Sequence, residues 1–127
     1  MVESRETKQK KIIQKEVDSM NFFFTAEELY GRVSKHDKNL GIATVYRFLR
    51  DLKKNRKIHL YTCDRKSLYS TKNLNHNHFI CEICEKKEHL NIDKIDFIKK
   101  FVSGDICHFQ IEVSGICESC KKHNIYK

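Results

Sequence analysis

The sequence predicts an α+β protein of two small domains, an N-terminal winged helix and a C-terminal α/β domain with a four-cysteine zinc site. Three helix-type apolar patterns precede two short strand patterns, two Cys-x-x-Cys pairs lie beyond residue 80, and the net positive charge is confined to the first part. With 127 residues in total, neither half can bury a large core. An additional cross-link, such as a metal, is therefore expected.

The N-terminal part carries three amphipathic helix patterns. The first spans 7–20, with its apolar residues on one side. The second begins at Thr25, where Thr25 and Glu28 have the spacing of a capping box. The third follows Gly41, with apolar residues at spacings of three and four. The residues that this third pattern leaves toward solvent are Tyr46, Arg47, Arg50 and Lys54.

Strand patterns follow the helices. Residues 58–61 and 67–69 predict a hairpin, and three helices followed by a hairpin is the order of a winged helix. The polar stretch 71–75 predicts a hinge, which divides the chain into domains 1–70 and 76–127. The elements expected in the second domain are strands at 79–80, 90–92 and 109–113, and a helix carrying Ile95, Ile98, Phe101 and Val102.

Charge and hydropathy limit the classes of partner. The chain has 25 Lys and Arg against 17 Asp and Glu; residues 1–72 hold 17 and 9 of them, which leaves 8 and 8 for residues 73–127. A polyanion such as DNA is the simplest partner for the basic part, and a solvated basic surface is the alternative.

No apolar run predicts a membrane span, and the charged start does not resemble a signal peptide, so a cytoplasmic location is expected.

Four of the six cysteines form two Cys-x-x-Cys pairs, namely Cys81, Cys84, Cys117 and Cys120. Because cytosolic thiols stay reduced, such pairs indicate metal or redox chemistry before disulfides. Four thiolates are the ligand set of a closed, structural zinc site. The alternative is redox chemistry by the dithiols of a thiol-disulfide oxidoreductase. Cys63 and Cys107 lie outside the pattern and are expected to be small buried apolar residues.

Several segments resemble the ferric uptake regulator family. They are Thr7–Lys10, Thr25–Tyr30 (TAEELY), Gly41–Arg47 (GIATVYR), Asn75–Cys84 (NHNHFICEIC) and Ile111–Cys117 (IEVSGIC), so the resemblance runs nearly end to end. It implies a metal-dependent repressor and not an enzyme. It also implies a homodimer formed by the C-terminal dimerisation domains, with winged helices that bind palindromic operators in double-stranded DNA.

The resemblance makes the helix after Gly41 the recognition helix, which lies in the major groove of DNA. Arginine can bond guanine edges, tyrosine can contact a thymine methyl, and lysine can anchor phosphates. The residues expected to contact DNA are Thr44, Tyr46, Arg47, Arg50 and Lys54. For any single basic residue among them, a solvated helix face is the alternative.

The resemblance also implies a regulatory metal site whose occupancy selects the DNA-binding shape of the dimer. His76 and His78 stand at its two hinge positions, and their alternate spacing puts both on one side of an extended strand. His89 stands where the family usually has Glu or Asp and is the expected third ligand. His59 or Cys63 is the expected fourth.

Two other ligand positions depart from the family pattern. Phe23 stands where iron- and peroxide-sensing members have histidine, and Ser70 falls where the peroxide-sensing branch has aspartate. Imidazole ligands, with or without a thiolate, suit Zn, Ni, Cu or Fe(II) better than Mn. We therefore expect structural Zn²⁺ and a second, regulatory divalent metal, with Zn²⁺ slightly favoured over Fe²⁺. The alternatives within the family are an iron-dependent peroxide sensor and a constitutive DNA-binding module with structural zinc alone.

Overall fold

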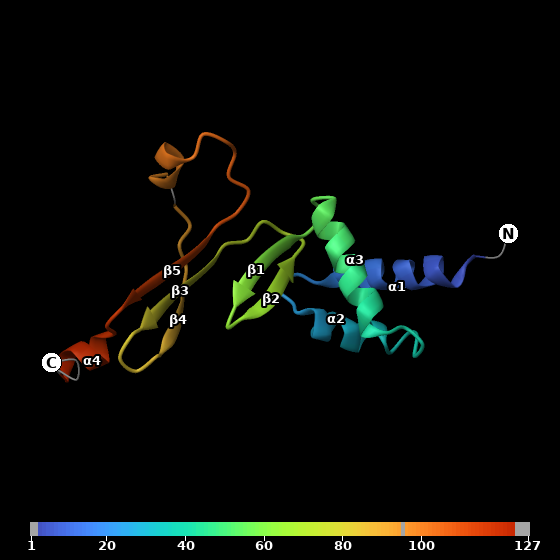
Figure 1. Cartoon of the computed structure of the whole chain (residues 1–127), viewed down its shortest axis with the longest axis horizontal. Coiled ribbons are helices and arrows are strands. Elements are labelled where there is room, and N and C mark those ends of the chain that lie inside the picture. The colour runs from blue at the N-terminus through green and yellow to red at the C-terminus, as the bar shows by residue number, and fades with distance from the viewer. Residues whose placement is uncertain (1–2, 95, 124–127) are drawn as a thin grey trace. The chain divides into compact units, whose positions relative to one another are not determined.

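The computed structural model describes residues 3–94 and 96–123. The chain divides into two compact units, Met1–Asn73 (unit 1) and Leu74–Lys127 (unit 2), and the division falls within the stretch 71–75. Figure 1 labels the helices and strands of both. Among the described residues, no helix combines the length and the apolar composition needed to cross a membrane.

Unit 1 has the order of elements that the sequence predicts for a winged helix. Ser4 caps α1, accepting a hydrogen bond from the Thr7 amide at 3.1 Å. Thr25 caps α2 in the predicted way, by accepting one from the Glu28 amide at 3.1 Å. The elements are α1 (Arg5–Ser19), α2 (Ala26–Val33), α3 (Ile42–Lys54), β1 (His59–Cys63) and β2 (Lys66–Ser70).

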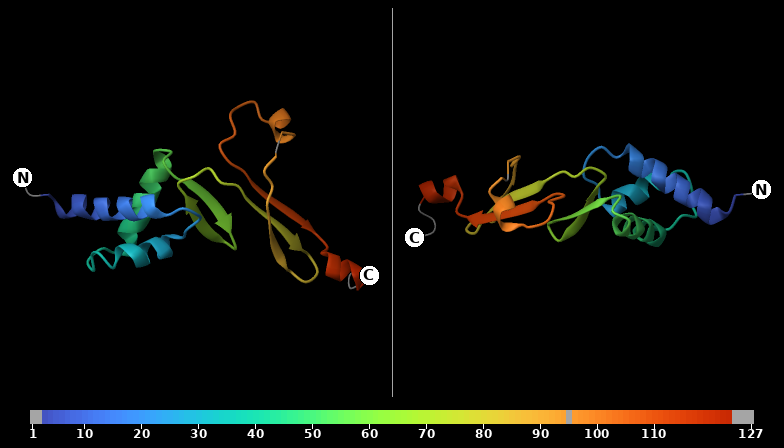
Figure 2. Two further views of the ribbon diagram at one scale, coloured as in Figure 1. Left: turned by 180° about the vertical axis from the view of Figure 1, so that it is seen from behind. Right: turned by 90° about the horizontal axis from the view of Figure 1, so that it is seen from above.

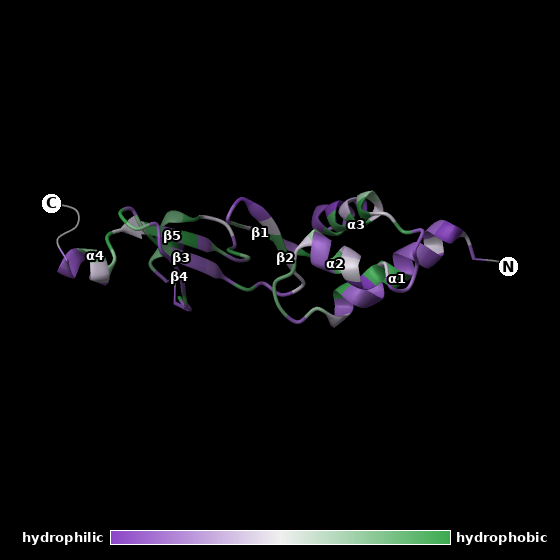
Figure 3. Cartoon of the chain, turned by 90° about the horizontal axis from the view of Figure 1, so that it is seen from below, coloured by the Kyte–Doolittle hydropathy of each residue, from purple (hydrophilic) through white to green (hydrophobic). Residues whose placement is uncertain are grey.

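The apolar faces of the three helices form one core. Ile13 of α1, Leu29 of α2 and Val45 of α3 are each fully buried in it. Phe24, just before α2, exchanges two backbone hydrogen bonds with Tyr69 of β2, at 3.0 and 2.8 Å, which ties the hairpin to the helices. In Figure 3 the outward turns of α1 are mostly hydrophilic. Most of the periodic apolar positions are therefore core positions, as predicted, whereas Ile42 at the start of α3 is 37% exposed.

The hairpin turn of unit 1 is strained. β1 and β2 are antiparallel, and the pair Cys63–Lys66 closes a two-residue turn made by Asp64 and Arg65. Both turn residues have positive φ, 51° and 65°. This combination is the type I′ pattern, which favours Asn-Gly because glycine has no Cβ to clash in the left-handed region.

Relaxing this turn is expected to stabilise unit 1. The double substitution Asp64→Asn, Arg65→Gly should raise its free energy of unfolding by about 1 kcal/mol, because glycine at 65 removes a cost of about 1–2 kcal/mol, which the greater freedom of glycine in the unfolded chain partly offsets. Urea unfolding followed by helix circular dichroism measures the change. Lys66→Gly, in the adjoining strand, should instead destabilise the unit. Equal destabilisation by both changes would contradict strain at the turn.

Unit 2 is built on a three-stranded sheet of order β4-β3-β5. The central strand β3 (His76–Cys81) runs antiparallel to β4 (Lys87–Leu90) and parallel to β5 (Gln110–Gly115). Each strand overlaps a predicted one. The helix α4 (Glu118–Lys122), which the sequence did not predict, follows β5 and is capped by the Cys117 side chain.

The helix predicted around Ile98 and Phe101 is wrong. The segment forms only a short 3₁₀ helix, η1 (Ile98–Phe101), which stands away from the sheet in Figures 1 and 2. The Phe101 side chain is 85% exposed and Val102 is 41% exposed. An amphipathic helix needs an apolar surface to pack on. The buried cluster of unit 2 consists of three cysteines with Phe79 against them, and it offers little such surface. Ile95 lies outside the described residues.

Candidate metal centres and nucleic-acid interface

The four cysteines of the two Cys-x-x-Cys pairs converge in unit 2. Cys81 ends β3, Cys84 lies in the next turn, Cys117 caps α4 and Cys120 lies within it. Their sulfur atoms all lie within 4.8 Å of one another; Cys81 and Cys120 are 3.9 Å apart, and Cys84 and Cys117 are 3.7 Å apart. A tetrahedron with zinc–sulfur bonds of ~2.3 Å has edges of ~3.8 Å. The cluster therefore fits zinc in both donor type and spacing.

Backbone amides surround the Cys81 sulfur. It accepts hydrogen bonds from the amides of Cys117 at 3.3 Å, Ile83 at 3.4 Å and Cys84 at 3.5 Å. These bonds, led by that from Cys117, lower the pKa of the Cys81 thiol to about 6. Burial raises the pKa of the Cys120 thiol to about 12. These opposite shifts favour the thiolate form of Cys81 and the thiol form of Cys120.

This pattern predicts how zinc affinity depends on pH. A metal binds the thiolate form, so binding at pH 7 must displace at least the Cys120 proton. We expect affinity at this cluster to fall at least about tenfold for each unit of acidification from pH 8 to pH 6, and more steeply below about 6, where Cys81 is protonated as well. Competition with a chromophoric chelator measures it. Cys107→Ser should give the same curve, and a flat profile would contradict the assignment.

The other two cysteines, Cys63 and Cys107, differ in burial. Cys107 is exposed, and its sulfur lies 3.3 Å from Nδ1 of His108. Cys63, at the end of β1, is half-buried. The expectation that both would be small buried apolar residues is therefore wrong for Cys107, which lies in the long connection before β5, where no core forms.

Three of the predicted histidines meet on one face of the sheet in unit 2. His76 and His78 lie two residues apart in β3, and His89 of β4 is the register partner of His78. The ring centroids are 4.4 Å apart for His76 and His78, 4.8 Å for His78 and His89, and 5.3 Å for His76 and His89. His76 and His78 are buried, whereas His89 is exposed. The strand register thus creates a three-imidazole cluster separate from the four-cysteine cluster.

The protonation state of this cluster suits metal binding. Burial, followed by the proximity of His78 and His89, lowers the pKa of His76. A lowered pKa keeps the imidazole neutral at physiological pH, and the neutral ring is the form that binds metals. The geometry and the charge state together make the cluster a second candidate metal centre.

The candidates for a fourth ligand and the two departing positions lie in unit 1. His59 begins β1, opposite Ser70, and Cys63 ends it, opposite Lys66. Phe23 packs edge-to-face on Tyr61, with ring centroids 4.9 Å apart. Ser70 is buried and accepts a hydrogen bond from the Lys72 amide at 3.1 Å. Phe23 and Ser70 therefore have packing and hinge contacts within unit 1.

The basic face of α3 is exposed, as the sequence predicts. Tyr46, Arg47, Arg50 and Lys54 are exposed, and Thr44 is half-buried. Arg47 donates a hydrogen bond from Nη2 to Oγ1 of Thr44 at 3.1 Å, within a groove of about 450 Å³ between α1 and α3. Glu6, Lys10 and Asp51 also line this groove, so cations and anions share it; the exposed cations Arg47, Arg50 and Lys54 are the groups that could contact phosphates.

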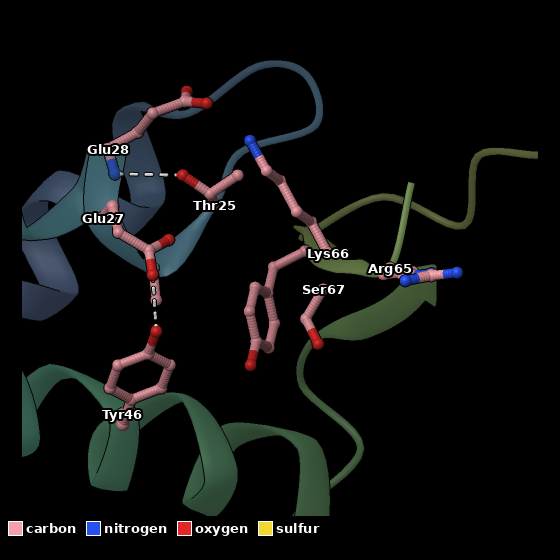
Figure 4. A pocket seen from close by; sticks show the side chains of 9 residues that line it. Thr25, Glu27, Glu28, Tyr46, Arg65, Lys66 and Ser67 are labelled. Carbon is pink, nitrogen blue, oxygen red and sulfur yellow. Dashed lines mark hydrogen bonds between the residues drawn. The ribbon is translucent and has the colours of Figure 1, made fainter. Parts of the chain in front are cut away.

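A second groove, of about 610 Å³, lies on the other side of α3, toward α2 and β2 (Figure 4). Tyr46 points into it, and its hydroxyl donates a hydrogen bond to Oε1 of Glu27 at 2.6 Å. The sequence reading missed Glu27. The one signal available was its place beside the capping residue Thr25, which indicates a helix start and not a partner for Tyr46.

Comparison with known proteins agrees with this description. The family model of the ferric uptake regulator family matches residues 2–114. The peroxide-responsive repressor PerR of Staphylococcus epidermidis is 29% identical over 123 residues, covering 93% of this chain and 82% of that protein.

Solved structures share the fold. The ferric uptake regulator Fur of Helicobacter pylori has a TM-score of 0.58 at 24% identity, covering 95% of this chain and 83% of that one. FurB of Mycobacterium tuberculosis, a zinc uptake regulator, has a TM-score of 0.51 at 23% identity, covering 91% and 95%. Since the family model spans most of the sequence, the chain belongs to the ferric uptake regulator family and is a metal-responsive, DNA-binding transcription regulator, not an enzyme.

Proposed function

We propose that this regulator is a cytoplasmic repressor in which unit 1 binds palindromic operators and unit 2 holds structural zinc, senses a second divalent metal and dimerises. The observation that carries the proposal is the cluster of His76, His78 and His89. A protein whose only metal is structural zinc needs no second group of converging metal ligands in addition to a complete four-cysteine cluster. The histidine cluster therefore favours a metal-responsive regulator over a constitutive DNA-binding module.

The proposed regulatory metal is zinc. Three imidazoles with a fourth ligand from His59 or Cys63 make a nitrogen-rich set, with or without one thiolate, that suits tetrahedral Zn²⁺. Metal at such a site would favour the DNA-binding shape of the dimer and so couple occupancy to affinity.

An iron-dependent peroxide sensor is the second candidate. The names of the staphylococcal relatives favour it, because they are peroxide-responsive repressors. Phe23 and Ser70 argue against it, since neither supplies the ligand expected of that branch and both already have contacts within unit 1. Fe²⁺ thus remains the alternative regulatory metal to Zn²⁺.

The proposed dimer would form through unit 2. β5 is an edge strand of the sheet, and apolar side chains near it and on the preceding connection are exposed. They are Phe97, Phe101, Val102 and Val113. A second copy of the chain is the partner that would cover them, and a palindromic operator matches the two-fold symmetry of a homodimer.

Two substitutions on α3 test operator recognition. Arg47→Ala should cost about 1–3 kcal/mol of discrimination between the duplex that the wild-type protein selects from a random pool and a scrambled duplex, because a bidentate base contact is lost. Lys54→Ala should weaken both complexes about equally. It should also reduce the slope of log affinity against log salt concentration by about 1 per subunit, as expected for a phosphate contact.

Affinities for both duplexes, measured over a range of salt concentrations, separate the two effects. Lys122→Ala, at an exposed cation of unit 2, is the matched control and should leave both affinities unchanged. Unaltered discrimination in Arg47→Ala would contradict the role given to α3.

A further inference from the structure

An acidic side chain, that of Glu27, forms a hydrogen bond with one of the residues proposed to contact DNA. Glu27 is in the first turn of α2, and its carboxylate accepts a hydrogen bond from the Tyr46 hydroxyl at 2.6 Å. The two residues are 19 positions apart in sequence, so the contact depends on the packing of α2 against α3. Figure 4 shows the Tyr46 ring rising from α3 toward Glu27. An anion so placed is unexpected on a surface that attracts a polyanion.

The contact has the features of a charge-assisted hydrogen bond. A distance of 2.6 Å is in the short range found when a hydroxyl donates to an ionised carboxylate. The bond lowers the pKa of Glu27 and raises the pKa of Tyr46, so at neutral pH the donor is a phenol and the acceptor a carboxylate. Lys66, across the groove, further favours the ionised carboxylate.

We propose that Glu27 is a positioning and specificity-determining residue for operator recognition, which fixes the Tyr46 ring for base contact. This inference rests on the proposed function, because it presumes that α3 reads DNA.

The role is one of preorganisation. Tyr46 is 44% exposed, so packing alone does not hold its ring in one position. The hydrogen bond to Glu27 restricts the ring before DNA arrives, and a side chain that is already ordered loses less entropy on binding. The benefit is realised only where Tyr46 meets its base, which raises operator affinity relative to other sequences.

The charge of Glu27 has a separate effect. A carboxylate beside the groove repels phosphates of any sequence, so it lowers the affinity for the selected and for the scrambled duplex alike. The charge therefore does not change the ratio of the two affinities. Specificity comes from the hydrogen bond to Tyr46, whose benefit depends on the base contact.

Glu28 provides a matched control. It is the next residue in α2, carries the same charge, is exposed and lines the same groove. The phenol of Tyr46, however, is bonded to Glu27. Replacing Glu28 therefore changes the charge of the groove without removing this hydrogen bond.

The test uses the full-length, metal-loaded protein and two duplexes at fixed salt, the one that wild type selects from a random pool and a scrambled one. Glu27→Ala and Glu28→Ala should both bind the scrambled duplex several-fold more tightly, since each removes one negative charge. Only Glu27→Ala should lower the ratio of selected to scrambled affinity, by about fivefold or more. Glu27→Gln, whose amide oxygen still accepts a hydrogen bond from the Tyr46 hydroxyl, should keep the ratio within about twofold of wild type.

A double-mutant cycle completes the test. Tyr46→Phe should lower the ratio as Glu27→Ala does, and the double variant should lower it no further, because both changes remove the same hydrogen bond. An unchanged ratio in Glu27→Ala, an equal loss in Glu28→Ala, or additive losses in the cycle would overturn the role of Glu27. A wild-type protein that enriches no sequence would overturn the DNA-binding function itself. Both glutamates and Tyr46 are exposed, so equal thermal melting of all variants verifies their folding.

Discussion

Replacing Cys81 and Cys117 together by serine is expected to release the structural zinc and unfold unit 2 while unit 1 stays folded. The buried cluster of unit 2 is formed by Cys81, Cys117 and Cys120 with Phe79 packed against them, so the metal site is its core. Structural zinc contributes about 10–16 kcal/mol of apparent binding free energy at pH 7, as much as the whole stability of an ordinary domain. Unit 1 has an extensive apolar core of its own.

Zinc content and amide hydrogen exchange measure this outcome together. The variant should lose the zinc that resists mild chelation, and protection should disappear from β3 and β5 but persist in α1 and α3. Cys107→Ser, at an exposed cysteine of the same unit, should keep both the zinc and the protection. Full protection of β3 in a zinc-free double variant would show that the cluster is not what stabilises the unit.

Removing either buried histidine is expected to abolish binding of the regulatory metal. His76→Ala and His78→Ala should each lower the affinity for the second metal by more than about 100-fold, because loss of even an outer-shell partner costs about 10–100-fold and these residues are proposed ligands. Zinc at the cysteine cluster should remain, since its donors are other residues.

Competition between protein and chelator, with the first zinc already in place, measures this second affinity. His36→Ala is the control, because His36 is exposed in unit 1 and its Nε2 lies 3.1 Å from Oε1 of Glu16. If His76→Ala binds the second metal as wild type does, the three-histidine cluster is not the regulatory site.

The features predicted correctly from sequence are those fixed by local spacing. The apolar period of α3 and the Thr25 cap of α2 each depend on residues within a few positions. Cys81 and Cys84 meet because a two-residue spacer brings both sulfurs to one point. Pairing of His78 with His89 is different, since it depends on strand register, and the resemblance to the family, not any local pattern, pointed to it.

The features missed depend on what lies across space. The apolar spacing around Ile98 and Phe101 suits a helix, but spacing does not reveal whether a surface exists to receive it. α4 was missed because it has five residues and its cap, Cys117, is also a metal-ligand candidate. Likewise Glu27 was recognised only as part of a helix start, since its bond to Tyr46 requires α2 and α3 to be packed together.

The central claim is that a second metal controls DNA binding, and one titration tests it most directly. Affinity for the selected duplex is measured at fixed salt under three conditions. The protein first carries zinc only at the cysteine cluster, then receives added Zn²⁺, and in a separate anaerobic titration receives added Fe²⁺. We expect added Zn²⁺ to tighten binding at least about tenfold, which is about 1.4 kcal/mol of coupling. Equal affinity with and without the added metals would contradict the claim and leave a DNA-binding protein whose only metal is structural.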